Sequence, residues 1–148
     1  MILLDTHVIS EPLRLNGDPK VAAWIDAQVL ETLYLSTVSL AELRYGITVL
    51  PEGKRKAALR TNLDERVLPM FDSRILPFDS ESADAYAALR VRARAAGKSI
   101  GTADAYIAAI AAAHGFTVAT RDTSPFEAAG VPVINPWEEA ADSPGPRG

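Results

Sequence analysis

Short, uninterrupted apolar runs alternate along this chain with longer segments whose apolar residues recur at helical spacing. Five such runs are typical of buried strands and lie at 2–4, 33–36, 75–78, 116–119 and 131–135. A strand that is apolar at every position needs cover on both faces, which a parallel sheet packed between helices provides. The alternation therefore predicts an α/β fold with three layers, α/β/α, and a central, mainly parallel sheet of about five strands.

The segments between these runs carry helix signals. They predict helices over 6–13, 19–29, 39–50, 54–68, 81–96 and 102–114. Ser39 and Glu42 match a capping box at the start of the third helix, and Thr102 is placed to cap the last. Pro132 marks the fifth strand as an edge strand, because proline cannot donate to a sheet ladder.

Length and composition bound the domain organisation. The 148 residues, 48% of them hydrophobic, suit one domain, which we assign to residues 1–138. We expect the proline- and glycine-rich residues 139–148 to be a disordered tail. Cysteine is absent, which excludes disulfides and thiolate sites and fits a cytoplasmic protein. No apolar run reaches the roughly 18 residues of a membrane span, so we expect no membrane contact.

Acidic residues recur where the predicted strands end. Asp5 follows the first strand, Glu42 lies in the helix after the second, and Asp122 follows the fourth. Asp104 lies in the first turn of the helix that leads into the fourth strand. Ligands of open parallel sheets bind outside the carboxyl ends of the strands, so these acids are candidates for a single site. Taken singly, each is also explained as a helix cap, a capping-box member or a turn residue.

Considered together, the acids need a cation. One carboxylate pair at 4 Å costs about 4 kcal/mol at an effective dielectric constant of about 20. A hard divalent ion relieves this repulsion through carboxylate oxygens. Because the chain has no cysteine and two histidines, Mg²⁺ or Mn²⁺ is the natural fit. The net charge of −4 argues against a generally basic nucleic-acid binder, so local charge has to decide that question.

The segments that contain these acids resemble the motifs of a PIN domain, and specifically of a VapC-type toxin of the FitB-like subgroup. They are ILLDT at 2–6, STVSLAEL at 36–43, DAYIA at 104–108 and ATRD at 119–122. The resemblance covers about residues 1–137. It implies a ribonuclease toxin of a type II toxin–antitoxin system that hydrolyses RNA phosphodiesters with a metal-activated water. It also implies Mg²⁺ or Mn²⁺ as cofactor and inhibition by a cognate, VapB-like, DNA-binding antitoxin, in a homodimer or a toxin–antitoxin hetero-oligomer.

Carried over by position, the resemblance implies roles for individual residues. It makes Asp5, Glu42, Asp104 and Asp122 the catalytic acids, hereafter the acidic quartet. Asp5 and Asp104 become the direct metal ligands, and the other two complete the site partly through water. Thr6 and Thr120 become supporting residues.

Two positions depart from the family pattern. His7 stands where the family usually has asparagine, and it either replaces a hydrogen bond beside the ligands or itself ligates or transfers a proton. Pro125 stands where many relatives carry an aspartate, which places more reliance on Asp122.

RNA beside an acidic pocket requires basic contacts. Arg44 and Arg121 are the candidates for the scissile phosphate. Two basic clusters, at 54–60 and 90–98, either contact the RNA backbone or are solvated helix faces. Apolar residues at 39–50 and 54–68, Tyr45 among them, are explained mainly by core packing, and some by a dimer or antitoxin surface. We also expect the antitoxin to insert a basic side chain into the acidic pocket.

Two other functions fit parts of this pattern. One is a PIN-like fold kept only for binding, against which the retained quartet argues. The other is a receiver-like domain with Asp79 as phosphoacceptor. That reading needs an acidic pair after the first strand and a lysine after the fifth, whereas Asp5 stands alone and Asn135-Pro136 follow the fifth.

Overall fold

The structure, a computed structural model, describes residues 1–139 and contains one five-stranded parallel sheet in the order β3-β2-β1-β4-β5. The strands are β1 (Ile2–Leu4), β2 (Leu33–Ser36), β3 (Ile75–Leu76), β4 (Thr117–Ala119) and β5 (Val133–Ile134). The predicted parallel sheet is confirmed. The edge strands β3 and β5 are shorter than the apolar runs predicted, because each pairs on one side only. Apart from Glu139, the predicted tail lies outside the described residues.

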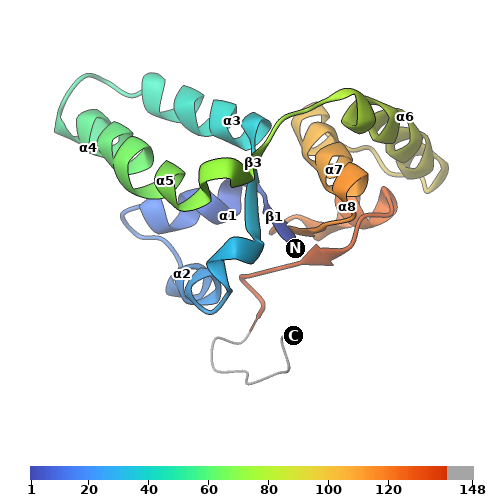
Figure 1. Cartoon of the computed structure of the whole chain (residues 1–148), viewed down its shortest axis with the longest axis horizontal. Helices are drawn as coiled ribbons and strands as arrows, with labels where there is room; N and C mark the ends of the chain where they lie inside the picture. The colour runs from blue at the N-terminus through green and yellow to red at the C-terminus, as the bar shows by residue number, and fades with distance from the viewer. Residues whose placement is uncertain (140–148) are drawn as a thin grey trace.

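Helices of varied length connect the strands (Figure 1). The α-helices are α1 (Thr6–Ser10), α2 (Pro19–Asp26), α3 (Thr37–Thr48), α4 (Lys54–Asn62), α5 (Leu68–Phe71), α6 (Ser80–Ala95), α7 (Thr102–His114) and α8 (Thr123–Ala128). There are also short 3₁₀ turns: η1 (Glu11–Leu13) follows α1, η2 (Leu30–Thr32) precedes β2, and η4 (Asp72–Arg74) precedes β3. A π-helical turn, η3 (Leu63–Val67), joins α4 to α5. No helix within residues 1–139 is both long and apolar enough to cross a bilayer.

Two predicted helix caps are wrong. Helix α3 begins before Ser39, because Ser36 ends β2 in an extended conformation and its Oγ accepts a hydrogen bond from the Ser39 N–H at 3.0 Å. An extended residue followed by a helical turn is the geometry of an N-cap, so Glu42 belongs to no capping box. At α7 the N-cap is Gly101, which has no capping side chain, and Thr102 is already helical.

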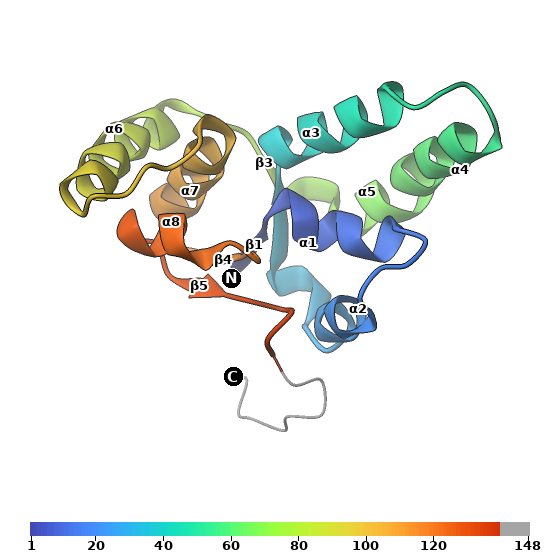
Figure 2. The ribbon, with the colours of Figure 1, turned by 180° about the vertical axis from the view of Figure 1, so that it is seen from behind.

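The sheet separates two apolar clusters. Figures 1 and 2 show the helices that cover them, α6, α7 and α8 on one side of the strands and α1 to α5 on the other. Leu3 and Val118 belong to the cluster covered by α6, α7 and α8. The next residues along the same strands, Leu4 and Ala119, belong to the cluster that includes residues of α1 to α5. This period-two alternation between two buried faces is the expected side-chain pattern of a covered parallel sheet.

Helix α7 is packed more deeply than the other helices. Its alanines 105, 108, 109 and 111 and its isoleucines 107 and 110 are all fully buried. Alanine adds little bulk, so α7 lies close against both the sheet and α6. This close packing fixes the first turn of α7, which carries Asp104, beside the carboxyl edge of the sheet.

The strand order creates a crevice at the carboxyl edge between β1 and β4. From β1 the chain proceeds outward through β2 to β3, then returns to β4 and proceeds the other way to β5. The segments that leave β1 and β4 therefore lead to helices on opposite faces, α1 and α8. Such a topological switch point is where open parallel sheets bind ligands.

Candidate active site

Asp5 lies at this switch point, with both of its carboxylate oxygens held by the protein. It follows β1, caps α1 and is 5% exposed. Its Oδ1 accepts a hydrogen bond from the Thr6 N–H at 2.8 Å. Its Oδ2 accepts from Oγ1 of the fully buried Thr120, at the end of β4, at 2.9 Å. Burial nevertheless outweighs these bonds and raises the pKa of Asp5. Asp5 is thus fixed in orientation and forms no ion pair with a base of residues 1–139, although the charge of His7 opposes the shift.

Thr120 also connects Asp5 to Asp122. The Asp122 N–H donates to Thr120 Oγ1 at 3.2 Å, so the three residues form one chain of hydrogen bonds. Asp122 occupies the N-cap position of α8, but its carboxylate makes no capping hydrogen bond. The structural explanation of Asp122 as a helix cap or turn residue therefore fails, and its exposed carboxylate is available to a ligand.

Glu42 reaches the same place from α3. The Thr6 hydroxyl donates to Glu42 Oε1 and lies 3.0 Å from Ser39 Oγ. These contacts join the first turn of α1 to α3, across 36 residues of sequence. Glu42 is consequently directed at the Asp5 site by a hydroxyl group, rather than toward the start of its own helix.

Asp104 completes the group from the first turn of α7. Its half-buried carboxylate has no hydrogen-bond partner within the described part of the chain. Burial, followed by the negative charges of Asp5, Asp122 and Glu42, raises the pKa of Asp104 to about 6, although His7 opposes the shift. The structure therefore brings all four predicted acids into one electrostatic neighbourhood.

A pocket of about 440 Å³ opens over these groups. Its lining residues are Asp5, Thr6, His7, Ala41, Glu42, Tyr45 and Asp104. Asp122 lies outside this lining, and it acts on Asp104 through its charge. His7 is exposed at the wall of the pocket. Tyr45 is 71% exposed, so core packing, the main explanation for the apolar residues of this helix, does not apply to it.

No basic side chain of residues 1–139 forms an ion pair with the quartet. The described ion pairs join Arg14 to Glu11, Arg44 to Asp64 and Lys56 to Glu52. Within that same part of the chain, no three His, Asp or Glu side chains are already grouped to hold one metal ion. Magnesium commonly binds through one or two carboxylates and retains several waters, so this hard-oxygen donor set fits it without a full protein cage.

The predicted phosphate contacts already have protein partners. Arg44 forms an ion pair with Asp64 at 2.7 Å. The Arg121 guanidinium lies over the Trp137 ring, 5.1 Å from its centroid. Both guanidinium groups would have to exchange these contacts for a phosphate, so the structure does not place either one on the quartet.

Each of the two basic clusters includes side chains that already have protein partners. In the first, Lys56 is buried and donates to Glu52 at 2.8 Å and to the Thr48 carbonyl at 3.0 Å. In the second, Arg92 donates to the Ala129 carbonyl at 3.2 Å. The remaining bases of the second cluster, Arg90, Arg94 and Lys98, line a surface pocket of about 480 Å³ at the end of α6.

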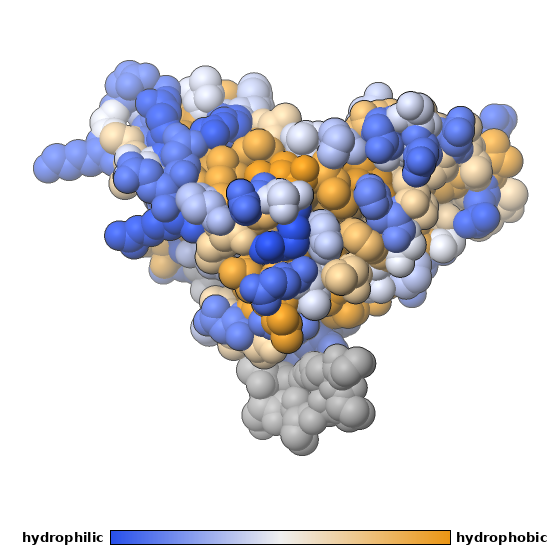
Figure 3. Space-filling model, in the orientation of Figure 1, coloured by the Kyte–Doolittle hydropathy of each residue, from blue (hydrophilic) through white to orange (hydrophobic). Residues whose placement is uncertain are grey.

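Much of the molecular surface is hydrophilic, as Figure 3 shows for one face.

The fold, the switch-point carboxylates and the matching sequence identify the class of protein. The chain belongs to the PIN domain family, which it matches over residues 2–131. The sheet order also rules out the receiver-like alternative, because receivers of the flavodoxin type have the order 2-1-3-4-5.

Among individual relatives, the chain is similar to the VapC ribonuclease Y4jK of Sinorhizobium fredii, with 56% identity over 95% of this chain and 100% of the relative. It is 52% identical to the toxin FitB of Neisseria gonorrhoeae, over 94% of this chain and 100% of FitB. It also superposes on the crystal structure of FitAcB from N. gonorrhoeae with a TM-score of 0.90, over 94% of this chain and 100% of that one, at 52% identity.

Proposed function

We propose that this chain is the toxin of a VapBC-type toxin–antitoxin pair and acts as a Mg²⁺- or Mn²⁺-dependent endoribonuclease. The observation that carries the proposal is the convergence of Asp5, Glu42 and Asp104 on one pocket at the switch point, where burial and the charges of Asp5, Asp122 and Glu42 raise the pKa of Asp104 to about 6. Four acids in one neighbourhood, none of them ion-paired to a base of residues 1–139, cost the fold stability and do not support it. A site that concentrates divalent cations has a use for them.

Some residues of the site would bind the cation, and others orient the carboxylates that bind it. Asp5 and Asp104 would hold the cation directly, while Glu42 and Asp122 would contact its water ligands. Thr120 and Thr6 fix the rotamers of Asp5 and Glu42 through the hydrogen bonds described above. When bound, the cation lowers the pKa of a water and stabilises negative charge on the phosphate. The protein thus supplies a prearranged carboxylate frame at which an RNA phosphodiester is hydrolysed.

RNA would approach this anionic pocket with the help of basic side chains nearby. Arg90, Arg94 and Lys98 at the end of α6 have no acidic partner in residues 1–139 and would bind backbone phosphates. Arg44 and Arg121 remain candidates for the scissile phosphate if they exchange their present partners.

The partner proposal rests on relatives that were solved as complexes. One similar structure is FitAB bound to an IR36 DNA fragment, at 51% identity and a TM-score of 0.91. Another is VapBC-5 of Mycobacterium tuberculosis, a member of the VapBC family of toxin–antitoxin systems, at 26% identity and a TM-score of 0.66. We infer that this chain binds a VapB-like, DNA-binding antitoxin, as a homodimer or within a hetero-oligomer. A basic antitoxin side chain in the acidic pocket would neutralise the quartet in place of the cation.

The direct test is cleavage of a labelled, mixed-sequence RNA by purified protein, with Mg²⁺ or Mn²⁺ and with a chelator. Wild type should cleave only with the cation, and Asp5→Asn should fold without cleaving. Asp79→Asn is the matched control, because Asp79 caps α6 beside His114, at the end of α7 opposite Asp104, and asparagine caps equally well. If wild type neither binds Mg²⁺ in calorimetry nor cleaves, the chain is a binding module and the proposal is wrong.

A further inference from the structure

Tyr45 is the exposed exception among the large aromatic side chains. The chain has four tyrosines, four phenylalanines and two tryptophans, all within the described residues. Every other one is buried or partly buried, whereas Tyr45 is 71% exposed. The remaining tyrosines pack against rings, Tyr34 on Phe116 and Tyr86 on Tyr106. The Tyr45 ring has no such neighbour and no hydrogen bond in residues 1–139.

The position of this ring is tied to the acidic quartet. Tyr45 lines the same pocket as Asp5, Glu42 and Asp104. It lies three residues after Glu42 on α3, so the two side chains are neighbours on one face of the helix. Helix α3 is also anchored to the site through the contacts of Thr6 with Ser39 and Glu42. The ring is therefore held on a rigid element at the wall of the pocket.

The pocket has more room than an ion requires. A cation with six waters occupies roughly 200 Å³ at about 30 Å³ per water. The pocket measures about 440 Å³. The pocket therefore has room for a substrate group beside the hydrated ion, and its wall includes an aromatic face.

A neutral ring is also the type of contact that this neighbourhood tolerates. A lysine or arginine at the position of Tyr45 would pair with the carboxylates and compete with the cation. Aromatic rings bind nucleic-acid bases by stacking, which adds no charge and tolerates different bases. Substrate can therefore be held beside the acids without neutralising them.

We propose that Tyr45 is a stacking platform for the base of the nucleotide next to the scissile phosphate. This proposal rests on the ribonuclease function proposed above and adds a substrate-binding residue to it. The platform positions the RNA chain through a base, while the quartet acts on the phosphate. Its contribution lies in substrate binding, so it affects KM more than kcat.

The test compares Tyr45→Ala, Tyr45→Phe and Val49→Ala in steady-state cleavage of a single-stranded RNA whose cleavage site has been mapped with wild type. Stacking of one base predicts that Tyr45→Ala lowers kcat/KM by about 5- to 100-fold, mostly through KM. Tyr45→Phe keeps the ring and should stay within about twofold of wild type, since the hydroxyl has no role in stacking. Val49 is the matched control, because it is 58% exposed at the end of the same helix and does not line the pocket.

A substrate with an abasic residue beside the cleaved bond sharpens the test. Wild type should lose activity on it to the same extent as Tyr45→Ala does on normal RNA, and Tyr45→Ala should lose nothing more. Additive losses, or equal kcat/KM for Tyr45→Ala and wild type, would overturn the proposal. If Tyr45→Ala cleaves normally and is defective only in self-association or antitoxin binding, the ring is a protein contact and the proposal is likewise wrong. Failure of wild type to cleave would instead overturn the ribonuclease function.

Discussion

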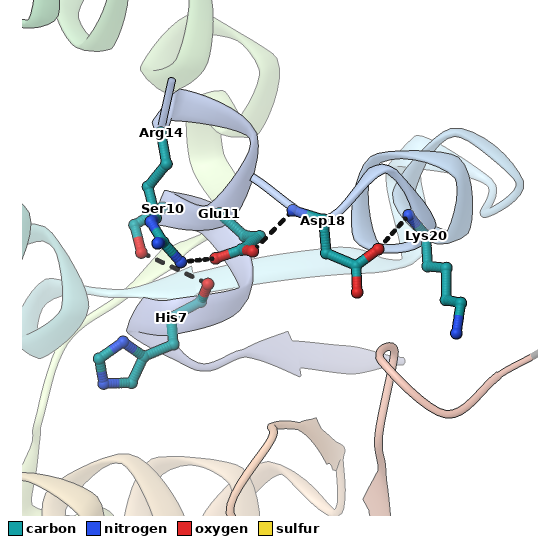
Figure 4. A network of polar contacts seen from close by, with 6 residues as sticks. All are labelled: His7, Ser10, Glu11, Arg14, Asp18 and Lys20. Atoms are coloured by element: carbon teal, nitrogen blue, oxygen red, sulfur yellow. Dashed lines mark hydrogen bonds and ion pairs between the residues drawn. The ribbon is translucent and has the colours of Figure 1, made fainter. Parts of the chain in front are cut away.

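Asp5 and Glu11 are both 5% exposed, and both lie on the short helical segment formed by α1 and η1. Their surroundings are opposite. Glu11 Oε1 accepts from Arg14 at 2.8 Å and Glu11 Oε2 accepts from the Asp18 N–H at 2.8 Å, a network shown in Figure 4. The hydrogen bond from Asp18, helped by Arg14, lowers the pKa of Glu11, although burial opposes the shift.

At Asp5 the pKa shifts in the opposite direction. Hydrogen bonds from Thr120 and Thr6 are present, yet burial dominates and raises the pKa, and Glu42 adds to the shift. Glu11 is stabilised by an arginine and a backbone N–H, whereas Asp5 lies deeper in the protein, where its hydrogen bonds and the charge of His7 do not offset the cost of burial. A low exposed fraction alone therefore does not mark a functional acid. A carboxylate whose burial is not offset does.

The largest expected difference between the two regions is in activity. Asp104→Asn should reduce RNA cleavage by on the order of 10³-fold or more, since groups that act directly at a reacting centre contribute at least about 10²- to 10³-fold. Glu11→Gln should cleave at the wild-type rate, because its carboxylate contacts only Arg14 and Asp18. Initial rates at saturating Mg²⁺ would measure both. Comparable losses in the two variants would contradict the distinction.

Next in size is the effect of removing the support for Asp5. Thr120→Val keeps the shape of the side chain and deletes its hydrogen bonds to Asp5 and from Asp122. We expect a 10- to 100-fold loss of Mg²⁺ affinity or activity, about the usual cost of disturbing a group that orients a metal ligand. Calorimetric titration of Mg²⁺ would detect it. An unchanged affinity would mean that Asp5 holds its orientation without Thr120.

The stability of the fold should depend on Glu11 instead. Glu11→Gln replaces a charge-assisted contact with Arg14, and we expect a loss of about 1–3 kcal/mol in the free energy of unfolding. Asp104→Asn removes a repelled carboxylate and should stabilise the cation-free protein at neutral pH. Urea denaturation in a chelator would compare the two variants. A stabilised Glu11→Gln would refute the structural role of this residue.

The smallest expected effect is a pH dependence of opposite sign in the two regions. The pKa of Asp104 is about 6 in the fold against an ordinary 3.8, so in this window the folded chain binds the additional proton. Its contribution to stability is therefore present at low pH and is lost as the pH rises through about 6. Glu11, with a lowered pKa, contributes above its ordinary 4.5 and loses that contribution as the pH falls.

Thermal melts of cation-free protein at about pH 5 and about pH 7.5 would measure this effect, with Asp104→Asn as the reference. Wild type should gain stability relative to Asp104→Asn at the lower pH. If the difference between the two proteins is the same at both pH values, Asp104 has no raised pKa in solution.

The sequence predicts the sheet correctly, and it predicts that the four acids lie near one another at the strand ends, because both follow from local signals. Runs such as 33–36 are apolar on both faces, and acids such as Asp5 stand directly at strand ends. The sequence does not predict side-chain contacts between residues that are far apart along the chain. The hydrogen bond between Thr120 and Asp5 spans 115 residues, and the ion pair of Arg44 with Asp64 joins two helical segments.

The remaining errors have local causes. The sequence analysis does not predict helix α8, because Thr123-Ser124-Pro125 is also a common turn sequence. Ser36 and Ser39 are both acceptable caps, and only the end of β2 decides between them. The sequence leaves Tyr45 between core packing and a dimer or antitoxin surface, because helical spacing does not reveal exposure. Its place three residues after Glu42 was the available signal.

The quartet is divided evenly between the two sides of the sheet. Asp5 and Glu42 belong to helical elements of one apolar cluster, while Asp104 and Asp122 precede or lie in helices of the other. An occupant bound from both sides links the two layers at the carboxyl edge, in addition to the strands and the direct contact of α3 with α7. Loading the pocket should thus slow amide hydrogen exchange in α1 and α7 together, and emptying it should speed exchange in both.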